Sequence, residues 1–218
     1  MKAVEKWLAN TSHAVTLFVI ADLFESVGFG EWFTALLAEH GERLTVGCHG
    51  LTHRSWSAWP EDGEGFEASL KQATAVLKEK AGGHFRPWFR APAGYIAPWM
   101  ATTLAGQGYT VDSSVNPSWL VRKKAGKGNS WADVNDAMAQ QGVLERPWAT
   151  RFSLPVNGPA LTKFPLSVIA RGVWKKAPSV LTGSEPDAVV PDTTQPLVTL
   201  YWHVLDHSRN KATWAPPL

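Results

Sequence analysis

Residues 45–54, with the sequence TVGCHGLTHR, read as a buried strand that runs directly into a turn carrying His49 and His53. Imidazole is the commonest neutral ligand of divalent metals, and an i, i+4 pair on a helical turn points both rings the same way. Residues that directly follow a strand of an α/β fold lie where such folds bind ligands. The pair therefore suggests a metal site, although this spacing in an arbitrary soluble protein more often marks surface or packed histidines.

Apolar runs and amphipathic segments alternate on both sides of this stretch. The runs predict strands at 14–21, 44–48, 85–89, 110–112 and 197–203. Helical spacing predicts helices at 3–10, 31–39, 64–81 and 98–106. Residues 119–168 are rich in Gly, Pro and Trp and are expected to be loop-rich, with one helix near 131–141. The alternation is typical of an α/β barrel or a doubly wound sheet.

The composition is that of a globular protein with one domain, residues 1–218. Hydrophobic residues make up 44% of the chain and charged residues 18%. A net charge of +2 is too small to argue for nucleic acid as a partner. The single cysteine, Cys48, excludes an internal disulfide and is interpreted as a small buried hydrophobe, with metal ligation as the less common alternative. The sequence leaves the oligomeric state open.

The amino-terminal residues 1–13 contain no long apolar run. The sequence as written thus shows neither a signal peptide nor a spanning helix, and we expect a cytoplasmic protein that does not associate with membranes.

Twelve tryptophans are the compositional outlier. Several of them, Trp88 and Trp202 included, crowd the segments that carry histidines and prolines. Indole faces stack on the apolar faces of sugar rings, and the indole N–H can bond to a hydroxyl. Structural packing is the commoner role of any single tryptophan, but the clustering favours a carbohydrate-like ligand.

Further motifs follow the histidine pair in the chain. FRAPAGY at 89–95, GYTVDSS at 108–114 and YWH at 201–203 each follow or end a predicted strand. With His49 and His53, and in this order, they resemble the polysaccharide deacetylase family of carbohydrate esterases. The resemblance covers about residues 1–207.

The resemblance implies an irregular (β/α) barrel with its active site at the carboxyl ends of the strands. It implies that His49 and His53 bind a divalent metal, zinc in the first place. Arg90 would orient a catalytic aspartate, and His203 would be the general acid toward the leaving amine. The groove for an acetylated glycan, or another amide substrate, would be lined by Pro92, Tyr95, Trp88 and Trp202.

The chain departs from this family at its start. The family's first strand, which ends in a pair of aspartates, has no counterpart before residue 14, so we expect a truncated start and a weakly held metal. Asp22 could substitute as a ligand, although a role as a helix N-cap is the commoner one. Asp112 is expected to be a turn or fold residue, and Asp206 and His207 are expected to be exposed.

The resemblance implies a hydrolase of non-peptide C–N amide bonds, most directly an N-deacetylase of an amino-sugar polymer or oligomer. Two alternatives stay open. The first is a catalytically impaired relic that binds a glycan without turning it over. The second is a hydrolase of a small cyclic amide, which Gly50 between the two histidines slightly favours.

Overall fold

The computed structural model describes residues 2–176 and 199–218, and these form an α/β fold. Five strands make one sheet in the order β1-β2-β3-β4-β5, and every neighbouring pair is parallel. A separate antiparallel hairpin is formed by β6 and β7. The strands are β1 (Val15–Val19), β2 (Leu44–Cys48), β3 (Phe85–Phe89), β4 (Val111–Asp112), β5 (Leu144–Glu145), β6 (Thr150–Arg151) and β7 (Leu154–Pro155). The α/β class predicted from the sequence is confirmed.

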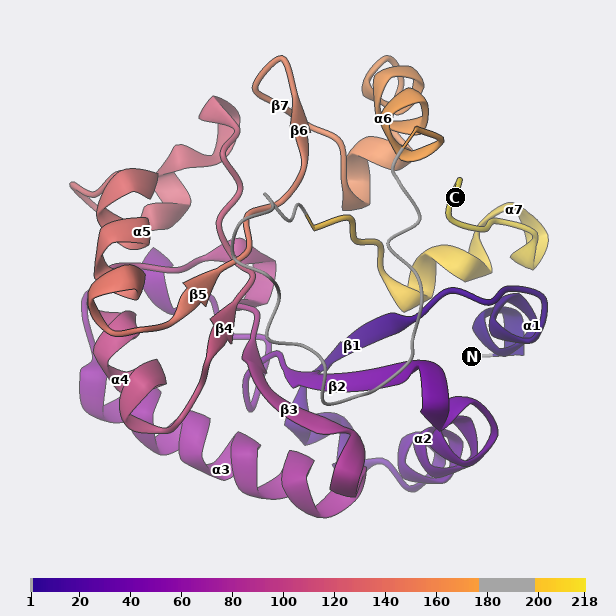
Figure 1. Cartoon of the computed structure of the whole chain (residues 1–218), viewed down its shortest axis with the longest axis horizontal. Helices are drawn as coiled ribbons and strands as arrows, with labels where there is room; N and C mark the ends of the chain where they lie inside the picture. Colours follow the sequence, from indigo (N-terminus) through magenta and orange to yellow (C-terminus); the bar gives the residue numbers. More distant parts are fainter. Residues whose placement is uncertain (1, 177–198) are drawn as a thin grey trace.

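Helices lie outside the arc of strands, as Figure 1 shows for α2, α3, α4 and α5. Their bounds are α1 (Lys2–Ala9), α2 (Val27–His40), α3 (Gly63–Ala81), α4 (Met100–Gly106), α5 (Trp131–Gln140), α6 (Leu166–Trp174) and α7 (Arg209–Ala212). No helix in the described part of the chain is long and apolar enough to cross a membrane.

The long helix α3 illustrates how local sequence sets an element. The Asp62 side chain accepts a hydrogen bond from the Gly65 amide and caps its start. Its apolar positions recur at helical spacing and are buried: Phe66, Leu70, Ala73, Leu77 and Ala81. Gly82, at φ 52°, ends the helix in a conformation that suits glycine. This helix therefore presents one apolar face to the strands.

The described part of the sheet is open and does not close into a barrel. Its edges are β1 and β5, and beyond β5 the chain continues into a parallel bridge between Trp148 and Thr199. Neighbours in the sheet are also neighbours in the chain, which is the strand order of an α/β barrel. The resemblance implied a barrel. The described residues form a curved parallel sheet of five strands that does not close.

The strand expected at 197–203 falls partly on residues outside the described part of the chain, namely 197 and 198. Thr199 forms the bridge to Trp148, and residues 200–203 are extended without regular strand pairing. The main core lies between the sheet and α2–α5 and includes Cys48, which is fully buried and free of a disulfide, as expected. A second apolar cluster joins the residues flanking the β6–β7 hairpin to α6 and the carboxyl-terminal segment, around Trp174 and Trp214.

Candidate active site

His49 follows directly after β2 at the carboxyl end of that strand. Its backbone N–H donates to the Val19 carbonyl at the end of β1, which places it level with the neighbouring strand end. Its ring Nδ1 lies 2.7 Å from the Arg90 carbonyl oxygen. Because a carbonyl only accepts, Nδ1 carries the proton, and the lone pair of Nε2 is left for a ligand.

The electrostatic surroundings keep His49 neutral. Burial lowers its pKa to about 3, and the positive charges of Arg90, His53 and His203 act in the same direction. The His53 ring lies edge-on to the His49 ring with 5.4 Å between centroids, and His53 itself is exposed. The three histidines of the predicted site therefore influence one another electrostatically at one end of the sheet.

The residues present do not make a complete metal site. Within the described residues, no group of three or more His, Cys, Asp or Glu side chains could hold a metal ion. His49 has the second hydrogen bond that is usual for a ligating imidazole, but a catalytic zinc takes three protein ligands. Two imidazoles alone therefore do not fit the expected zinc centre.

Asp22, the carboxylate considered as a substitute ligand, lies in the 3₁₀-helix η1 (Ala21–Glu25) after β1. Its backbone N–H donates to the Leu51 carbonyl, so its backbone lies beside the turn that carries the histidines. The N-cap of η1 is Ile20, without a side-chain cap bond, so the N-cap interpretation of Asp22 is wrong. Strand β1 ends at Val19, two residues before the predicted end at residue 21, so η1 begins at Ala21 and Asp22 lies inside its first turn.

Arg90 directly follows β3 and is buried, 7% exposed, among three aromatic rings from distant parts of the chain. Its guanidinium carbon lies 4.5 Å from the centroid of Phe18, 5.6 Å from Trp148 and 4.9 Å from Tyr201. Its Nε and Nη2 donate to the carbonyl and hydroxyl of Ser113. Burial lowers the pKa of Arg90 to about 10, so it remains charged at neutral pH.

Two carboxyl groups, Asp112 on β4 and Glu145 on β5, interact electrostatically with Arg90. Asp112 is fully buried and accepts hydrogen bonds from the amide and hydroxyl of Ser114, which makes it a fold residue, as expected. Burial raises the pKa of Asp112, and burial together with the adjacent Asp112 raises the pKa of Glu145 well above its ordinary value. Because Asp112 has the Ser114 donors and the charge of Arg90, Glu145 is the group that holds the shared proton.

The loop after β3 continues as the 3₁₀-helix η5 (Pro92–Gly94) and lies against the histidine turn. A Cβ on Gly50 would be 3.5 Å from the Pro92 ring, so Pro92 closes directly over the residue between the two histidines. Tyr95 follows, half-buried, with the Lys124 ammonium 5.2 Å from its ring centroid. Pro92 and Tyr95 therefore border the histidine turn, and their groove role stays a prediction.

The two tryptophans predicted to line the groove make other contacts. Trp88 lies within β3, two residues before Arg90 on the same face of the strand, and Arg146 lies 5.6 Å from its ring. Trp202 meets Trp7 with 5.2 Å between ring centroids and donates to His207 Nε2 at 2.9 Å. These contacts are those of packed aromatic rings, and the groove role of both stays a prediction.

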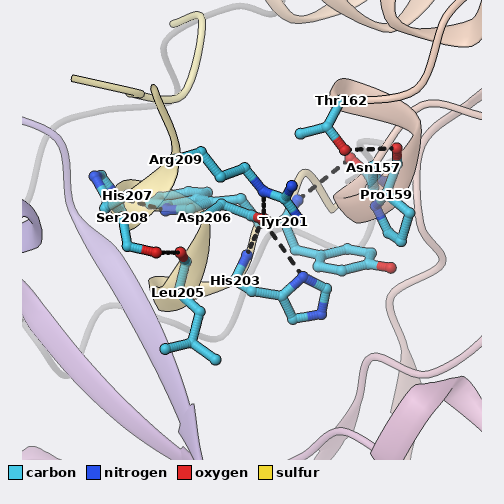
Figure 2. Close-up of polar contacts among 11 residues, drawn as sticks. Asn157, Pro159, Thr162, Tyr201, His203, Leu205, Asp206, His207, Ser208 and Arg209 are labelled. Atoms are coloured by element: carbon cyan, nitrogen blue, oxygen red, sulfur yellow. Dashed lines mark hydrogen bonds and ion pairs between the residues drawn. The ribbon is translucent and has the colours of Figure 1, made fainter. Parts of the chain in front are cut away.

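His203 lies in the extended segment that precedes the 3₁₀-helix η8 (Val204–Ser208). Its ring is edge-on to Tyr201, at 5.7 Å, and its Nδ1 lies 3.5 Å from Asp206 Oδ2 (Figure 2). The expectation that Asp206 and His207 are exposed is wrong: they are 5% and 2% exposed. Asp206 turns back to bond the His203 backbone, and His207 packs between the rings of Trp7 and Trp214.

Comparisons with known proteins add little to this geometry. No protein-family model matches the sequence, and no curated protein is significantly similar to it. A crystal structure described as "putative polysaccharide deacetylase from Mycobacterium smegmatis" matches with 18% sequence identity and a TM-score of 0.45. The match covers 67% of this chain and 62% of that chain, so the present chain spans less than two thirds of its length. Similarity at this level shows neither a family nor a function.

Proposed function

We propose that the chain is a hydrolase of non-peptide C–N amide bonds that removes acetyl groups from an amino-sugar polymer or oligomer. The observation that supports the proposal is the contact between the His49 and His53 rings, with His49 bonded to the Arg90 carbonyl and interacting electrostatically with His203, at the carboxyl end of a strand in a parallel sheet. The motifs that contain these residues are those that resemble the polysaccharide deacetylases, whose irregular barrel we propose for the complete fold.

The chemistry divides among these residues. Cleavage of an amide requires a proton for the departing nitrogen, and His203, with its ring 57% exposed, is free to approach a substrate. Arg90 holds the loop that bears Pro92, since its side chain is tied to Ser113 and its carbonyl to His49. We assign to it a positioning role. We propose in addition that His49 and His53 bind zinc weakly, since the described residues supply no third ligand.

A second candidate, a glycan-binding protein without turnover, is favoured by one observation. Among the described residues no carboxylate joins the two histidines in a group that could hold a metal ion. Such a protein would bind the same acetylated sugars and release no acetate.

The test is an incubation of the 218-residue chain with N-acetylglucosamine oligomers, with release of acetate and of free amine as the readout. We expect slow turnover that His203→Gln lowers by about 10²- to 10⁴-fold, the usual contribution of a general acid. His84→Gln, at the opposite end of β3, is the matched control. Saturable binding without acetate release would support the glycan-binding candidate instead. Hydrolysis of cyclic amides in preference to the oligomers would reject the proposed substrate class.

A further inference from the structure

A run of basic residues follows β4, on the 3₁₀-helix η6 (Trp119–Ala125) and in the turn after it. Its four cationic side chains are Arg122, Lys123, Lys124 and Lys127. Residues 113–132 contain no aspartate or glutamate, so these cations have no carboxylate in their own segment. Burial, and after it the charge of Lys123, lowers the pKa of Lys124. The cations repel one another, and an anionic ligand would relieve that repulsion.

Lys124 ties this run to the loops at the candidate site. Its Nζ donates to the Ala93 carbonyl at 2.6 Å, while its own carbonyl accepts the Ile96 amide at 3.2 Å and the Ser57 hydroxyl at 2.7 Å. Ala93 and Ile96 follow β3, and Ser57 lies in the 3₁₀-helix η3 (Trp56–Ala58), which comes after the histidine turn. The helix η6 is therefore anchored between the loops after β2 and β3, at the end of the sheet that carries the histidine turn.

The other three cations of the run are open to solvent. Arg122, Lys123 and Lys127 are exposed, and none of them forms an ion pair within the described part of the chain. Arg54, next to the histidine turn, differs in this respect, because its guanidinium lies 3.7 Å from the Asp62 carboxylate. The three exposed side chains of the run are therefore available to acidic groups of a ligand.

Exposed indole rings lie on the same two loops as these contacts. Trp59 directly follows η3 and is 64% exposed, and Trp119 begins η6 and is 63% exposed. The helices η3 and η6 contact each other. Tryptophan is highly buried on average, and an exposed indole presents a face for a sugar ring and an N–H for a hydroxyl. Cations and stacking surfaces thus adjoin on one pair of loops beside the histidine turn.

We infer that Arg122, Lys123 and Lys127 bind the carboxylates of an anionic glycan, an amino-sugar polymer with acidic sugars in its repeat. This inference rests on the proposed function and names the substrate class within it. Acidic sugars fit the two loops, because each repeat then offers a ring face to an indole and a charge to a cation. Exposed ion pairs are individually weak and are screened by salt, so several act together and the affinity falls as salt rises.

The test is equilibrium binding of two labelled oligomers of equal length to the full 218-residue chain. One oligomer contains N-acetylglucosamine alone, and in the other N-acetylglucosamine alternates with glucuronate. We expect the acidic oligomer to bind about 10-fold more tightly at low salt, and we expect this advantage to disappear near 1 M salt, where charges are screened beyond about 3 Å. Equal affinity for the two oligomers at low salt, or an advantage that salt leaves unchanged, would overturn the inference.

A triple variant tests whether the basic run is responsible. Arg122→Gln, Lys123→Gln and Lys127→Gln together should remove most of the 10-fold advantage and leave the affinity for the neutral oligomer unchanged. All three side chains are exposed, so the variant is expected to fold. Lys124 is kept because its ammonium holds the Ala93 carbonyl. An undiminished advantage in the folded triple variant would place the acidic groups elsewhere and would overturn the inference.

The matched control changes the net charge by the same amount at a distance from η6. It combines Lys6→Gln, Lys71→Gln and Lys78→Gln, three exposed cations of α1 and α3, and should retain the advantage. An equal loss in both triple variants would show that overall charge alone is responsible and would overturn the inference.

Two further outcomes separate this inference from others. Tighter binding of a single-stranded thymidine oligonucleotide of equal charge would replace the glycan by nucleic acid and refute the inference. Salt-sensitive binding of the acidic oligomer without acetate release would refute the proposed hydrolase alone, because binding is measured without turnover. Acetate release from the neutral oligomer, with no preference for the acidic one in binding, would refute the anionic substrate and leave the hydrolase.

Discussion

The ring of His49 donates its Nδ1 proton to the backbone carbonyl of Arg90, 2.7 Å away, and so links the ends of β2 and β3. The bond ties the orientation of a potential ligand to the loop that carries Pro92. It also leaves the lone pair of Nε2 available to a ligand, because burial keeps the ring neutral.

The first prediction concerns zinc. We expect the chain to bind zinc weakly and to lose most of it on mild dialysis, because two imidazoles leave the ion short of a ligand. Titration calorimetry with zinc should show weak binding that His49→Ala abolishes and His84→Ala preserves. Metal analysis that finds nearly one zinc per chain after dialysis would contradict this and would require a third ligand.

The second prediction concerns the buried guanidinium. Arg90→Lys keeps the charge but cannot donate in the same plane to the Ser113 carbonyl and hydroxyl while stacking on aromatic rings. We expect the free energy of unfolding in urea to fall by about 1–3 kcal/mol, the usual cost of unsatisfied buried polar groups. Exposed Arg171→Lys is the control. Equal stability of the two variants would argue against a stabilising role for the three rings around Arg90, those of Phe18, Trp148 and Tyr201.

A third prediction follows from the raised pKa of Glu145. Its pKa in the folded chain lies well above the ordinary value of 4.5, so the folded state binds the extra proton. The stabilisation it gives is complete below pH 4.5 and is lost as pH rises through the folded-state pKa. Glu145→Gln mimics the protonated acid, so its stability relative to wild type should increase from acid to neutral pH. The exposed control is Glu31→Gln. If the free energy of unfolding changes with pH in the same way in the wild type and in both variants, the pKa of Glu145 is not raised by folding.

The fourth prediction concerns Gly94, in the loop after β3. A Cβ there would lie 2.8 Å from the Trp148 ring and 3.2 Å from the Ser114 carbonyl, at a φ of 71°. Gly94→Ala should therefore lower the free energy of unfolding by about 1–3 kcal/mol through crowding. Gly83→Ala, with open space around its Cβ, is the matched control in the same denaturation experiment. A neutral Gly94→Ala would show that Trp148 can move without cost.

Elements with a strong local signal could be predicted closely. The bounds of β2 and β3 match the apolar runs, and α3 matches its helical spacing and its glycine stop. The position of His49 at a strand end followed from the same runs. These features depend on neighbours in the chain, so the sequence carries them directly.

Features that depend on distant partners could not be predicted in this way. Asp206 and His207 look like exposed residues after a strand, and they are buried because Arg209, Trp7 and Trp214 surround them. A signal was available in the spacing of His203 and Asp206, since a carboxylate three residues later is placed to bond back to the first residue of a turn.

The three aromatic rings around Arg90 come from positions far apart in the chain, which affects folding during synthesis. Phe18 and Arg90 leave the ribosome long before Tyr201, the third ring that covers the guanidinium. Until Tyr201 is synthesised, the Arg90 guanidinium lacks one of the rings that cover it and stays accessible to water on that side. The ends of β1 and β3 are therefore fully covered only when the carboxyl-terminal segment packs against them. A nascent chain halted before Tyr201 would keep this region exposed and would bind chaperones.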